Sequence, residues 1–210
     1  MKPKLSYPQD FQEALTNKLT DAELGLLSKP PLFVYNYLML PSVLDYILEL
    51  ADDEEPSTLA DSMTPSSSLV LTQATLLDHK LYRFGGTEYL SGMEEHDLPA
   101  AVPDNFSGAS IDGMLIFGLD PQQRGLINEF EMDHGMQLQN VRVEICLDDG
   151  EFRTMDAGAF VWTEEVSAMD PYPKPSWSVD AFLEGKMYQS MMRRMSNAVD
   201  HNSVVSSIEL

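Results

Sequence analysis

The sequence predicts an α+β fold built around a curved, mostly antiparallel sheet. Predicted strands outnumber predicted helices along the 210 residues. Residues 141–147 alternate aliphatic with mostly polar side chains, the period-two pattern of a strand with one solvent-facing side. Asp148-Asp149-Gly150 then predicts a tight turn into a partner strand that runs from Phe152 to Trp162. No internal repeat is visible, so one sheet with flanking helices accounts for the pattern.

The first 30 residues predict a polar N-terminal extension with one helix. The helix is expected from roughly Asp10 to Leu27, because Leu15, Leu19 and Leu24 fall near one face. Pro30-Pro31 end it, since proline supplies no backbone N–H and clashes with the preceding turn. The domain proper is expected to begin at residue 31.

The next segments predict alternating strands and helices. Leu32–Tyr35 is a buried strand by composition, and Pro41 begins a helix that extends to about residue 50. Residues 52–68 are rich in acidic residues, Ser and Pro, which is typical of a flexible insertion. Residues 69–82 and 88–101 predict short strands and turns separated by a glycine pair.

The most informative stretch is residues 110–131. Its first half contains a short apolar run, residues 114–117, with glycines at both ends, which predicts a buried strand. Asp120-Pro121 is a helix-start signal: the Asp120 carboxylate can cap the helix, and the proline ring fixes the backbone φ near its helical value. The short helix ends at Glu131, directly after Phe130. The pKa of a carboxylate beside a packed aromatic can be tuned for proton transfer, although most carboxylates are solvated surface groups.

The chain closes with a predicted helix and a tail. The segment from Trp177 to Arg194 is predicted to be a helix, because Phe182 and several methionines recur at helical spacing. These side chains are expected to pack within the protein. Residues 196–210 are polar and predict a frayed C-terminal tail. The expected organisation is therefore an extension over 1–30, one domain over 31–195, and a tail.

Composition narrows the partners and the compartment. The net charge of −21 argues against nucleic acid and anionic membrane surfaces. The single cysteine, Cys146, excludes an internal disulfide framework and fits a reducing compartment. The N-terminus lacks the apolar segment of a secretory signal, and the longest apolar run, residues 32–40, is too short to span a membrane. We therefore expect a cytoplasmic protein that binds neither nucleic acid nor membranes.

No cofactor or metal is expected from the motifs. The four histidines are scattered without metal-ligand spacing, and the chain has neither a glycine-rich phosphate loop nor a nucleophile elbow. Nothing near Cys146 suggests a thiolate, so its thiol is expected to be inert. Glu131 is left as the candidate for chemistry, by proton transfer, with a solvated surface carboxylate as the alternative.

Several motifs, taken in order, carry a resemblance to a known family. They are Phe33-Val34-Tyr35-x-x-Leu38-Met39, Leu98-Pro99-Ala100, residues 112–119, Phe130-Glu131, residues 141–147, residues 159–162, Trp177 and Phe182. Over roughly residues 31–195 the chain resembles the gamma-glutamylcyclotransferase-like superfamily, and within it the avirulence-induced branch of plants and fungi. The resemblance implies a compact, mixed and mostly antiparallel β-barrel flanked by helices.

The resemblance also implies an activity. In this superfamily the α-amine of a γ-glutamyl compound attacks its own γ-carbonyl, releasing an amine and 5-oxoproline. By resemblance Glu131 is the catalytic proton shuttle, and Tyr35, Asn36, Tyr37 and Leu38 line a substrate-binding loop whose backbone N–H groups hold an anion. The implied enzyme is an acyltransferase or lyase that acts on a γ-glutamyl amide.

The chain departs from the family pattern within this loop. Asn36 stands where the family has glycine, and we expect it to tolerate the positive φ that glycine allows. Tyr37 replaces a small hydroxyl residue, Asn128 replaces an aspartate, and Leu138-Gln139 replaces a Tyr-Arg pair. Two alternatives therefore stay open: a non-catalytic binding or scaffold protein, and a biosynthetic tailoring enzyme with a non-glutamyl substrate. Tyr35 and Tyr37 have the further alternative of being packing residues.

Overall fold

The computed structural model describes most of the chain between its N-terminus and residue 193. The described residues are 1–27, 30–49, 69–84, 99–104, 108–132, 136–164, 169–171, 178–186 and 188–193. Met1–Trp177 form one compact unit, and the chain from Ser178 onward forms a second. The predicted insertion at 52–68 and the tail at 196–210 lie outside the described residues, as do Leu98, His134 and Trp177.

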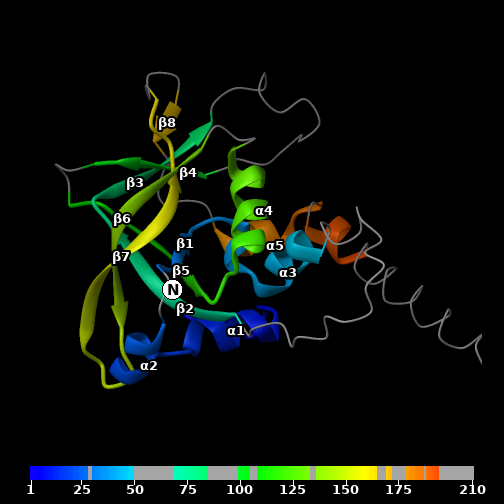
Figure 1. Ribbon diagram of the computed structural model, residues 1–210. Coiled ribbons are helices and arrows are strands. Elements are labelled where there is room, and N and C mark those ends of the chain that lie inside the picture. The colour runs from blue at the N-terminus through cyan, green and yellow to red at the C-terminus, as the bar shows by residue number, and fades with distance from the viewer. Residues whose placement is uncertain are drawn as a thin grey trace, which may run out of the picture. The chain divides into compact units, whose positions relative to one another are not determined.

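Five strands of the first unit close into a barrel (Figure 1). In spatial order they are β1 (Leu32–Val34), β5 (Ser110–Phe117), β2 (Val70–Leu77), β6 (Gln137–Cys146) and β7 (Phe152–Val161). Four of the five strand pairs are antiparallel, and β1 pairs with β7 in parallel. The barrel is therefore mixed and mostly antiparallel, which confirms the predicted α+β class.

Three further strands form a separate antiparallel sheet in the order β4-β3-β8. They are β3 (His79–Phe84), β4 (Pro99–Pro103) and β8 (Met169–Pro171). The chain passes from β2 to β3 through Asp78, which has a φ of 56°. Aspartate is one of the few non-glycine residues that enter this left-handed region readily. The sharp bend lets β3 leave the barrel instead of continuing alongside β6.

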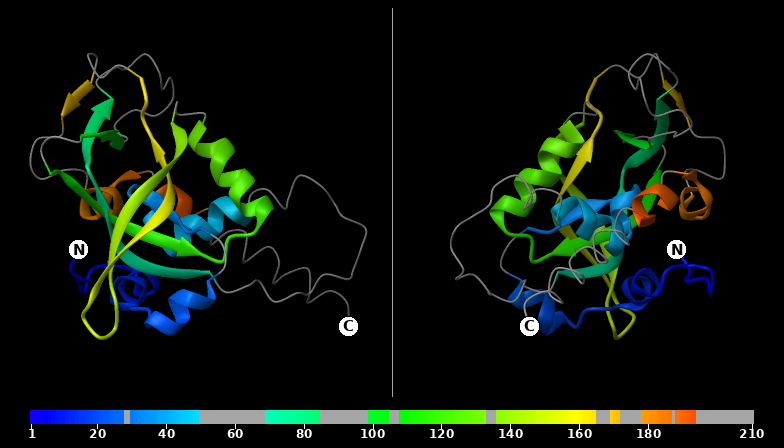
Figure 2. Two further views of the ribbon diagram at one scale, coloured as in Figure 1. Left: turned by 60° about the vertical axis from the view of Figure 1, so that its left-hand side comes forward. Right: turned by 90° about the vertical axis from the view of Figure 1, so that its right-hand side faces the viewer.

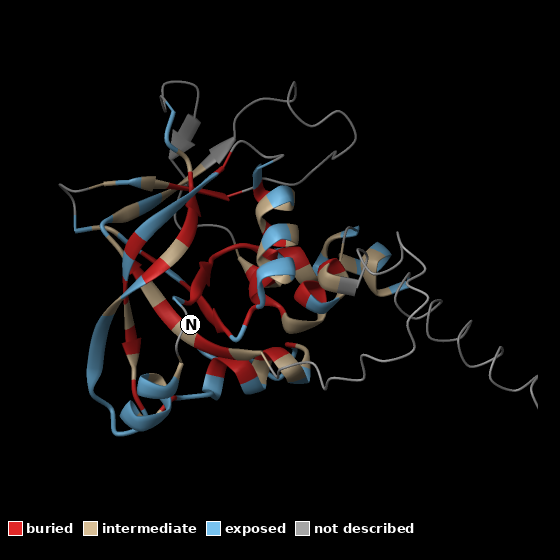
Figure 3. Ribbon diagram, in the orientation of Figure 1, coloured by how far each residue is buried: buried red, intermediate tan, exposed pale blue. Residues whose placement is uncertain are grey.

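Alternate residues of the barrel strands fill its interior. The buried interior side chains come from every barrel strand and include Phe33, Ala74, Leu76, Ile111, Leu115, Phe117, Val143, Ile145, Ala157 and Ala159. Figure 3 shows the buried positions running along the strands where they wrap the interior. In β6 the predicted alternation is confirmed, since Val141, Val143 and Ile145 are buried while Arg142 is exposed. Burial of this apolar surface is the main stabilising contribution.

Gly113 allows β1 to lie close against β5. A Cβ added at Gly113 would overlap the Val34 carbonyl oxygen and the ring of Phe33. Phe33 is fully buried and pairs across the ladder with Leu115. The Phe33 ring therefore uses the space that a side chain at position 113 would need.

The N-terminal segment contains two helices where one was predicted. They are α1 (Gln9–Thr16) and α2 (Asp21–Leu26), and α2 begins with a capping box between Thr20 and Glu23. Between the helices, Asn17 Nδ2 donates to the Leu71 carbonyl at 2.8 Å, and the Thr72 hydroxyl donates to the Asn17 carbonyl at 2.7 Å. A continuous helix was the wrong prediction, because hydrogen bonds to β2 compete with helical bonds at this point.

Helices α3 (Pro41–Glu49) and α4 (Pro121–Met132) contact each other beside the barrel (Figure 1). Both proline starts are confirmed. Asp120 caps α4 as predicted: its Oδ1 accepts the Gln123 N–H at 2.8 Å, and Gln123 Oε1 accepts the Asp120 N–H at 3.0 Å. The first turn of α3 is capped from a distance, since Asp10 Oδ2 accepts the Ser42 N–H at 3.0 Å.

The β6–β7 hairpin extends past the barrel, and its turn lies beside α2 (Figure 2). Gly150 takes a φ of 88° in the turn, as the Asp-Asp-Gly sequence predicts. The Asp148 N–H donates to the Leu19 carbonyl at 3.1 Å, and Arg153 pairs with Asp21 at 2.8 Å. These contacts join the hairpin to the N-terminal segment.

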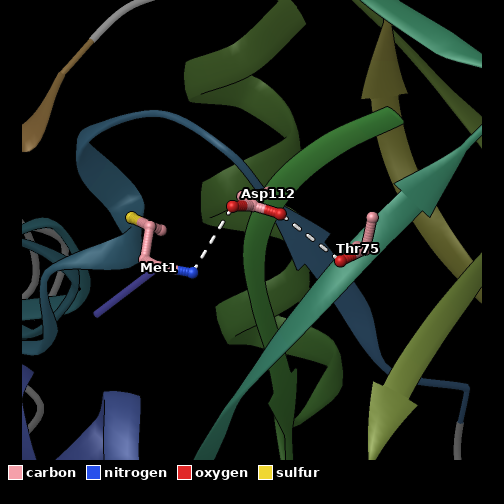
Figure 4. A network of polar contacts seen from close by, with 3 residues as sticks. All are labelled: Met1, Thr75 and Asp112. Carbon is pink, nitrogen blue, oxygen red and sulfur yellow. Dashed lines mark hydrogen bonds and ion pairs between the residues drawn. The ribbon is translucent and has the colours of Figure 1, made fainter. Parts of the chain in front are cut away.

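A small polar network lies on the outer side of β5 (Figure 4). The Met1 ammonium lies 3.4 Å from Asp112 Oδ2, and the Thr75 hydroxyl donates to Asp112 Oδ1, also at 3.4 Å. The Asp112 side chain is 56% exposed. Long, solvent-exposed contacts of this kind contribute little to stability.

The second unit contains α5 (Val179–Glu184), which Ser178 caps by accepting the Ala181 N–H at 3.1 Å. The chain leaves the helix at Gly185 and is helical again at residue 186 and over residues 188–193. The predicted helix from 177 to 194 is therefore interrupted. No helix in the described part of the chain is both long enough and apolar enough to cross a membrane.

Candidate functional site

Glu131 lies on the buried face of α4. The helix buries Ile127 and Glu131, which are four residues apart and so share one face. Only 5% of Glu131 is exposed. Glu129, two residues before it, and Met132, the residue after it, are both exposed to solvent. The prediction that the helix places Glu131 at its end is confirmed, and the side chain points into the protein.

The chain that follows β1 forms a buried bend. Tyr35 and Asn36 lead into a single 3₁₀ turn, η1 (Tyr37–Met39). Asn36 caps this turn, and its Oδ1 accepts the Leu38 N–H at 3.0 Å. Asn36 is only 6% exposed.

The backbone at Asn36 corrects one expectation. Its φ of −114° and ψ of −155° are extended, so the position does not use the left-handed conformation that we expected asparagine to tolerate there. Asparagine suits the position for another reason, because it is among the best residues for capping a helical turn.

A hydrogen bond joins the bend to the acid. Asn36 Nδ2 donates to Glu131 Oε1 at 2.8 Å across 95 positions of sequence. The structure thus brings together Glu131 and the bend 35–38, the two parts of the site that the sequence analysis singled out. A hydrogen bond from a neutral donor to a carboxylate is stronger than one between neutral groups, and burial strengthens it further.

Burial raises the pKa of Glu131 from 4.5 to about 7, and the hydrogen bond from Asn36 opposes part of this rise. The cause is desolvation, since a charged carboxylate loses hydration when it is buried. A carboxyl group with a pKa near neutrality can both accept and return a proton. Burial therefore moves the pKa of Glu131 into a range that suits proton transfer.

Tyr35 is buried, and its hydroxyl joins two strands. The hydroxyl donates to the Phe160 carbonyl at 2.8 Å and accepts the Ala101 N–H at 3.0 Å. Burial and the nearby charge of Glu131 raise its pKa. Its one hydroxyl hydrogen is already donated within the protein, which fits the packing alternative. A role in substrate binding stays a prediction.

Tyr37 is 2% exposed, and its ring packs edge-on against Phe130 with the ring centroids 5.8 Å apart. Burial, and then the charge of Glu131, raise the pKa of its hydroxyl. Phe130, which precedes the acid in the sequence, therefore packs against Tyr37. Whether Tyr37 contacts a substrate stays a prediction.

The backbone donors of the bend are largely used inside the bend. Asn36 Oδ1 accepts the Leu38 N–H, the Asn36 carbonyl accepts the Met39 N–H at 3.1 Å, and the Tyr37 carbonyl accepts the Leu40 N–H at 3.1 Å. An anion that bound these N–H groups would have to displace existing hydrogen bonds. This arrangement differs from the open anion-binding loop that the resemblance implies.

The other departures from the family pattern are on two elements: Asn128 is three residues before the acid on α4, and Leu138 is on β6. Asn128 Nδ2 donates to Met132 Sδ at 3.1 Å, and Leu138 is 51% exposed on β6. Cys146 accepts a hydrogen bond from Lys18 Nζ at 3.2 Å on the protein surface. Among the described residues, no group of three His, Cys, Asp or Glu side chains is placed to hold a metal ion.

A groove of about 340 Å³ lies elsewhere, where β2 bends into β3 beside β6. It is lined by Leu77–His79, Pro103, Gln139–Arg142, Val161 and Thr163. Neither Glu131 nor any residue of the bend lines it. No local sequence pattern predicted this groove, because the bend at Asp78 becomes visible only when its φ is known.

Comparisons with known proteins are limited to weak structural likeness. No protein-family model and no curated protein matches the sequence. An uncharacterized protein of Homo sapiens aligns at a TM-score of 0.43 and 15% identity, over 69% of this chain and 72% of that one. An uncharacterized protein of Pyrococcus horikoshii aligns at 0.37 and 17%, over 70% and 84%. A gamma-glutamyl cyclotransferase aligns at 0.39 and 13%, over 69% and 72%. At these scores the likeness does not assign the chain to a family.

Proposed function

We propose that this protein is a gamma-glutamylcyclotransferase-like enzyme of the cytoplasm. Its substrate is a small molecule that carries an amine and an amide, and Glu131 moves protons during an intramolecular aminolysis. No cofactor takes part in this reaction. The observation that carries the proposal is the buried Glu131 carboxyl group, whose pKa is about 7 and which is hydrogen-bonded to the bend at Asn36.

The proposed reaction needs one group that first accepts and then returns a proton. The ionised Glu131 takes a proton from the substrate ammonium, and the freed amine attacks the carbonyl carbon within the same molecule. As the carbonyl re-forms, the bond to the leaving nitrogen breaks, and the protonated Glu131 supplies the hydrogen. Two protons pass in all from the attacking to the leaving nitrogen, so Glu131 ends ionised as it began. General acid–base catalysis of this kind contributes roughly 10²- to 10⁴-fold.

The test compares Glu131→Gln with Glu129→Gln on a library of γ-glutamyl amines, γ-glutamyl dipeptides and the matching 4-aminobutanamides, which lack the carboxylate beside the amine. Glu129 lies on the same helix and is exposed, which makes it a matched control. We expect release of 5-oxoproline or the corresponding lactam, detected by mass spectrometry, to fall roughly 10²- to 10⁴-fold in Glu131→Gln. Glu129→Gln should match the wild type. Retained turnover in a folded Glu131→Gln protein would contradict the proposal.

A second candidate is a non-catalytic binding or scaffold protein. The specific observation in its favour is that the bend uses the N–H groups of Leu38, Met39 and Leu40 internally, beside a fully buried Tyr37. Under this alternative the wild-type protein releases no lactam from any library member. Product formation by the wild type that depends on Glu131 excludes it.

A further inference from the structure

The Asn36 carboxamide has the geometry of a bound ligand. Its oxygen accepts the Leu38 N–H at 3.0 Å, while its nitrogen donates to Glu131 Oε1 at 2.8 Å. The buried Asn36 side chain thus lies between a backbone donor, the Leu38 N–H, and a carboxylate acceptor, Glu131 Oε1. A small external molecule with one acceptor oxygen beside one N–H donor would satisfy the same two groups.

Only one oxygen of the acid is engaged by this bridge. Among the described residues Glu131 Oε1 accepts from Asn36, and no hydrogen-bond partner is found for Oε2. A carboxylate has capacity for about four hydrogen bonds, so Oε2 remains able to receive a proton from a substrate amine. The Leu38 N–H, in contrast, has a single hydrogen and is already paired.

We propose that the Asn36 carboxamide is an internal occupant of the Glu131 site and determines its specificity. It leaves Glu131 open to an amine but closes the Leu38 N–H to a carboxylate. The favoured substrate class is therefore an amine that carries no carboxylate group on the adjacent carbon. This inference rests on the proposed function in one respect, that Glu131 is the group that meets the substrate amine.

The physical reason for exclusion is the cost of displacing paired groups. A substrate carboxylate that bound the Leu38 N–H would move Asn36 away and break both of its hydrogen bonds. It would also bring a second negative charge near Glu131, which raises the free energy of the ionised acid. Loss of a buried hydrogen bond to a charged group alone corresponds to roughly tenfold or more in affinity.

The first experiment tests occupancy by replacing the missing side chain with a free molecule. In Asn36→Gly, acetamide should bind saturably and raise the midpoint of thermal unfolding, because it offers the same oxygen and the same N–H₂ group. Asn17→Gly is the matched control, since it loses the hydrogen bond that the Asn17 side-chain amide donates to the Leu71 carbonyl but leaves Asn36 in place. Wild type and Asn17→Gly should show no saturable response. No response in Asn36→Gly, or an equal one in the controls, overturns the inference.

A second variant guards against loss of folding. If Asn36→Gly does not fold, Asn36→Ala is used, because alanine lacks the backbone freedom of glycine yet leaves both the Leu38 N–H and Glu131 Oε1 without the carboxamide. Formamide, which matches the missing carboxamide, is then the probe, and saturable stabilisation of Asn36→Ala alone is expected. An equal response in Asn17→Gly overturns the inference as before.

The second experiment tests specificity with a matched pair of probes. They are γ-glutamyl-methylamide and 4-amino-N-methylbutanamide, which differ only in the carboxylate beside the amine. Calorimetry should show that the ratio of their affinities changes by roughly tenfold or more toward γ-glutamyl-methylamide in Asn36→Gly relative to wild type. A general loss of structure weakens both probes and leaves the ratio unchanged, and an unchanged ratio overturns the specificity claim.

These measurements are independent of turnover. If Glu131→Gln retains activity while acetamide binds Asn36→Gly, the proposed function fails and the occupancy of the site stands. If Glu131→Gln abolishes activity while neither binding experiment responds to Asn36, the inference fails alone.

Discussion

The barrel interior and the Glu131 site are both buried, yet they are stabilised in different ways. The interior holds aliphatic and aromatic side chains such as Phe33 and Leu115, whose burial is favourable wherever they pack well. The site holds an acid, an amide and a tyrosine hydroxyl, each of which needs a partner. Burial in the barrel interior therefore stabilises the fold. Burial of the polar groups at the Glu131 site costs free energy, and hydrogen bonds and protonation of the acid reduce this cost.

The largest effect on stability is expected in the barrel interior. Phe33→Ala removes a fully buried ring that packs over Gly113, and should lower the free energy of unfolding by about 3–5 kcal/mol. Chemical denaturation measures the change. Phe152→Ala is the control, since Phe152 is 67% exposed and its loss should cost far less. Equal losses in the two variants would contradict the assignment of the interior.

The next largest effect is expected at the Glu131 site, where stability should depend on pH, unlike in the apolar barrel interior. The native pKa of Glu131, about 7, lies above its ordinary 4.5, so the native state binds more protons than the unfolded state between these values. The stability contributed by the protonated form is complete below pH 4.5 and is lost as the pH rises to about 7. Glu131→Gln does not ionise, so its stability relative to wild type should increase by about 3 kcal/mol between pH 4 and pH 8.

The measurement for Glu131→Gln is urea denaturation at a series of pH values. Glu129→Gln serves as the control because Glu129 is exposed, and its stability should follow that of the wild type at every pH. A constant difference between Glu131→Gln and the wild type across this range would show that Glu131 is not desolvated.

A smaller effect is expected where the two regions meet. Tyr35→Phe removes the hydroxyl that bonds the Phe160 carbonyl and the Ala101 N–H, and leaves two buried backbone groups unpaired. We expect a loss of about 1–3 kcal/mol, the usual cost of an unsatisfied buried polar group. The half-buried Tyr46 provides the matched control as Tyr46→Phe. Thermal unfolding that is unchanged in Tyr35→Phe would contradict the structural role of the hydroxyl.

The smallest effect belongs to the surface. Arg153→Ala breaks the ion pair with Asp21, in which both side chains are more than half exposed. The expected change is below about 1 kcal/mol and should vanish in high salt. A double-mutant cycle with Asp21→Ala measures it, and a coupling as large as the effect at Tyr35 would contradict the exposed geometry.

Local sequence signals predicted the elements that depend on neighbouring residues. Asp120-Pro121 predicted the start of α4, and the alternation over 141–147 predicted which side of β6 is buried. The single N-terminal helix was wrong because Asn17 and Thr72 form bonds between segments far apart in the sequence. Glu131 was singled out as the candidate acid, but its sequence context is equally compatible with a solvated carboxylate.

The sequence by itself determined the α+β class, several of the strands and the position of the acid at the end of a helix, because periodicity and capping act over a few residues. The closed barrel was expected only from the family resemblance. Tertiary structure alone decided that Glu131 is buried and that Asn36, 95 positions away, donates to it. It also decided that Asn36 pairs with the Leu38 N–H in an extended conformation. The pKa of a carboxyl group depends on the solvent and partners that folding places around it, and no local pattern specifies these.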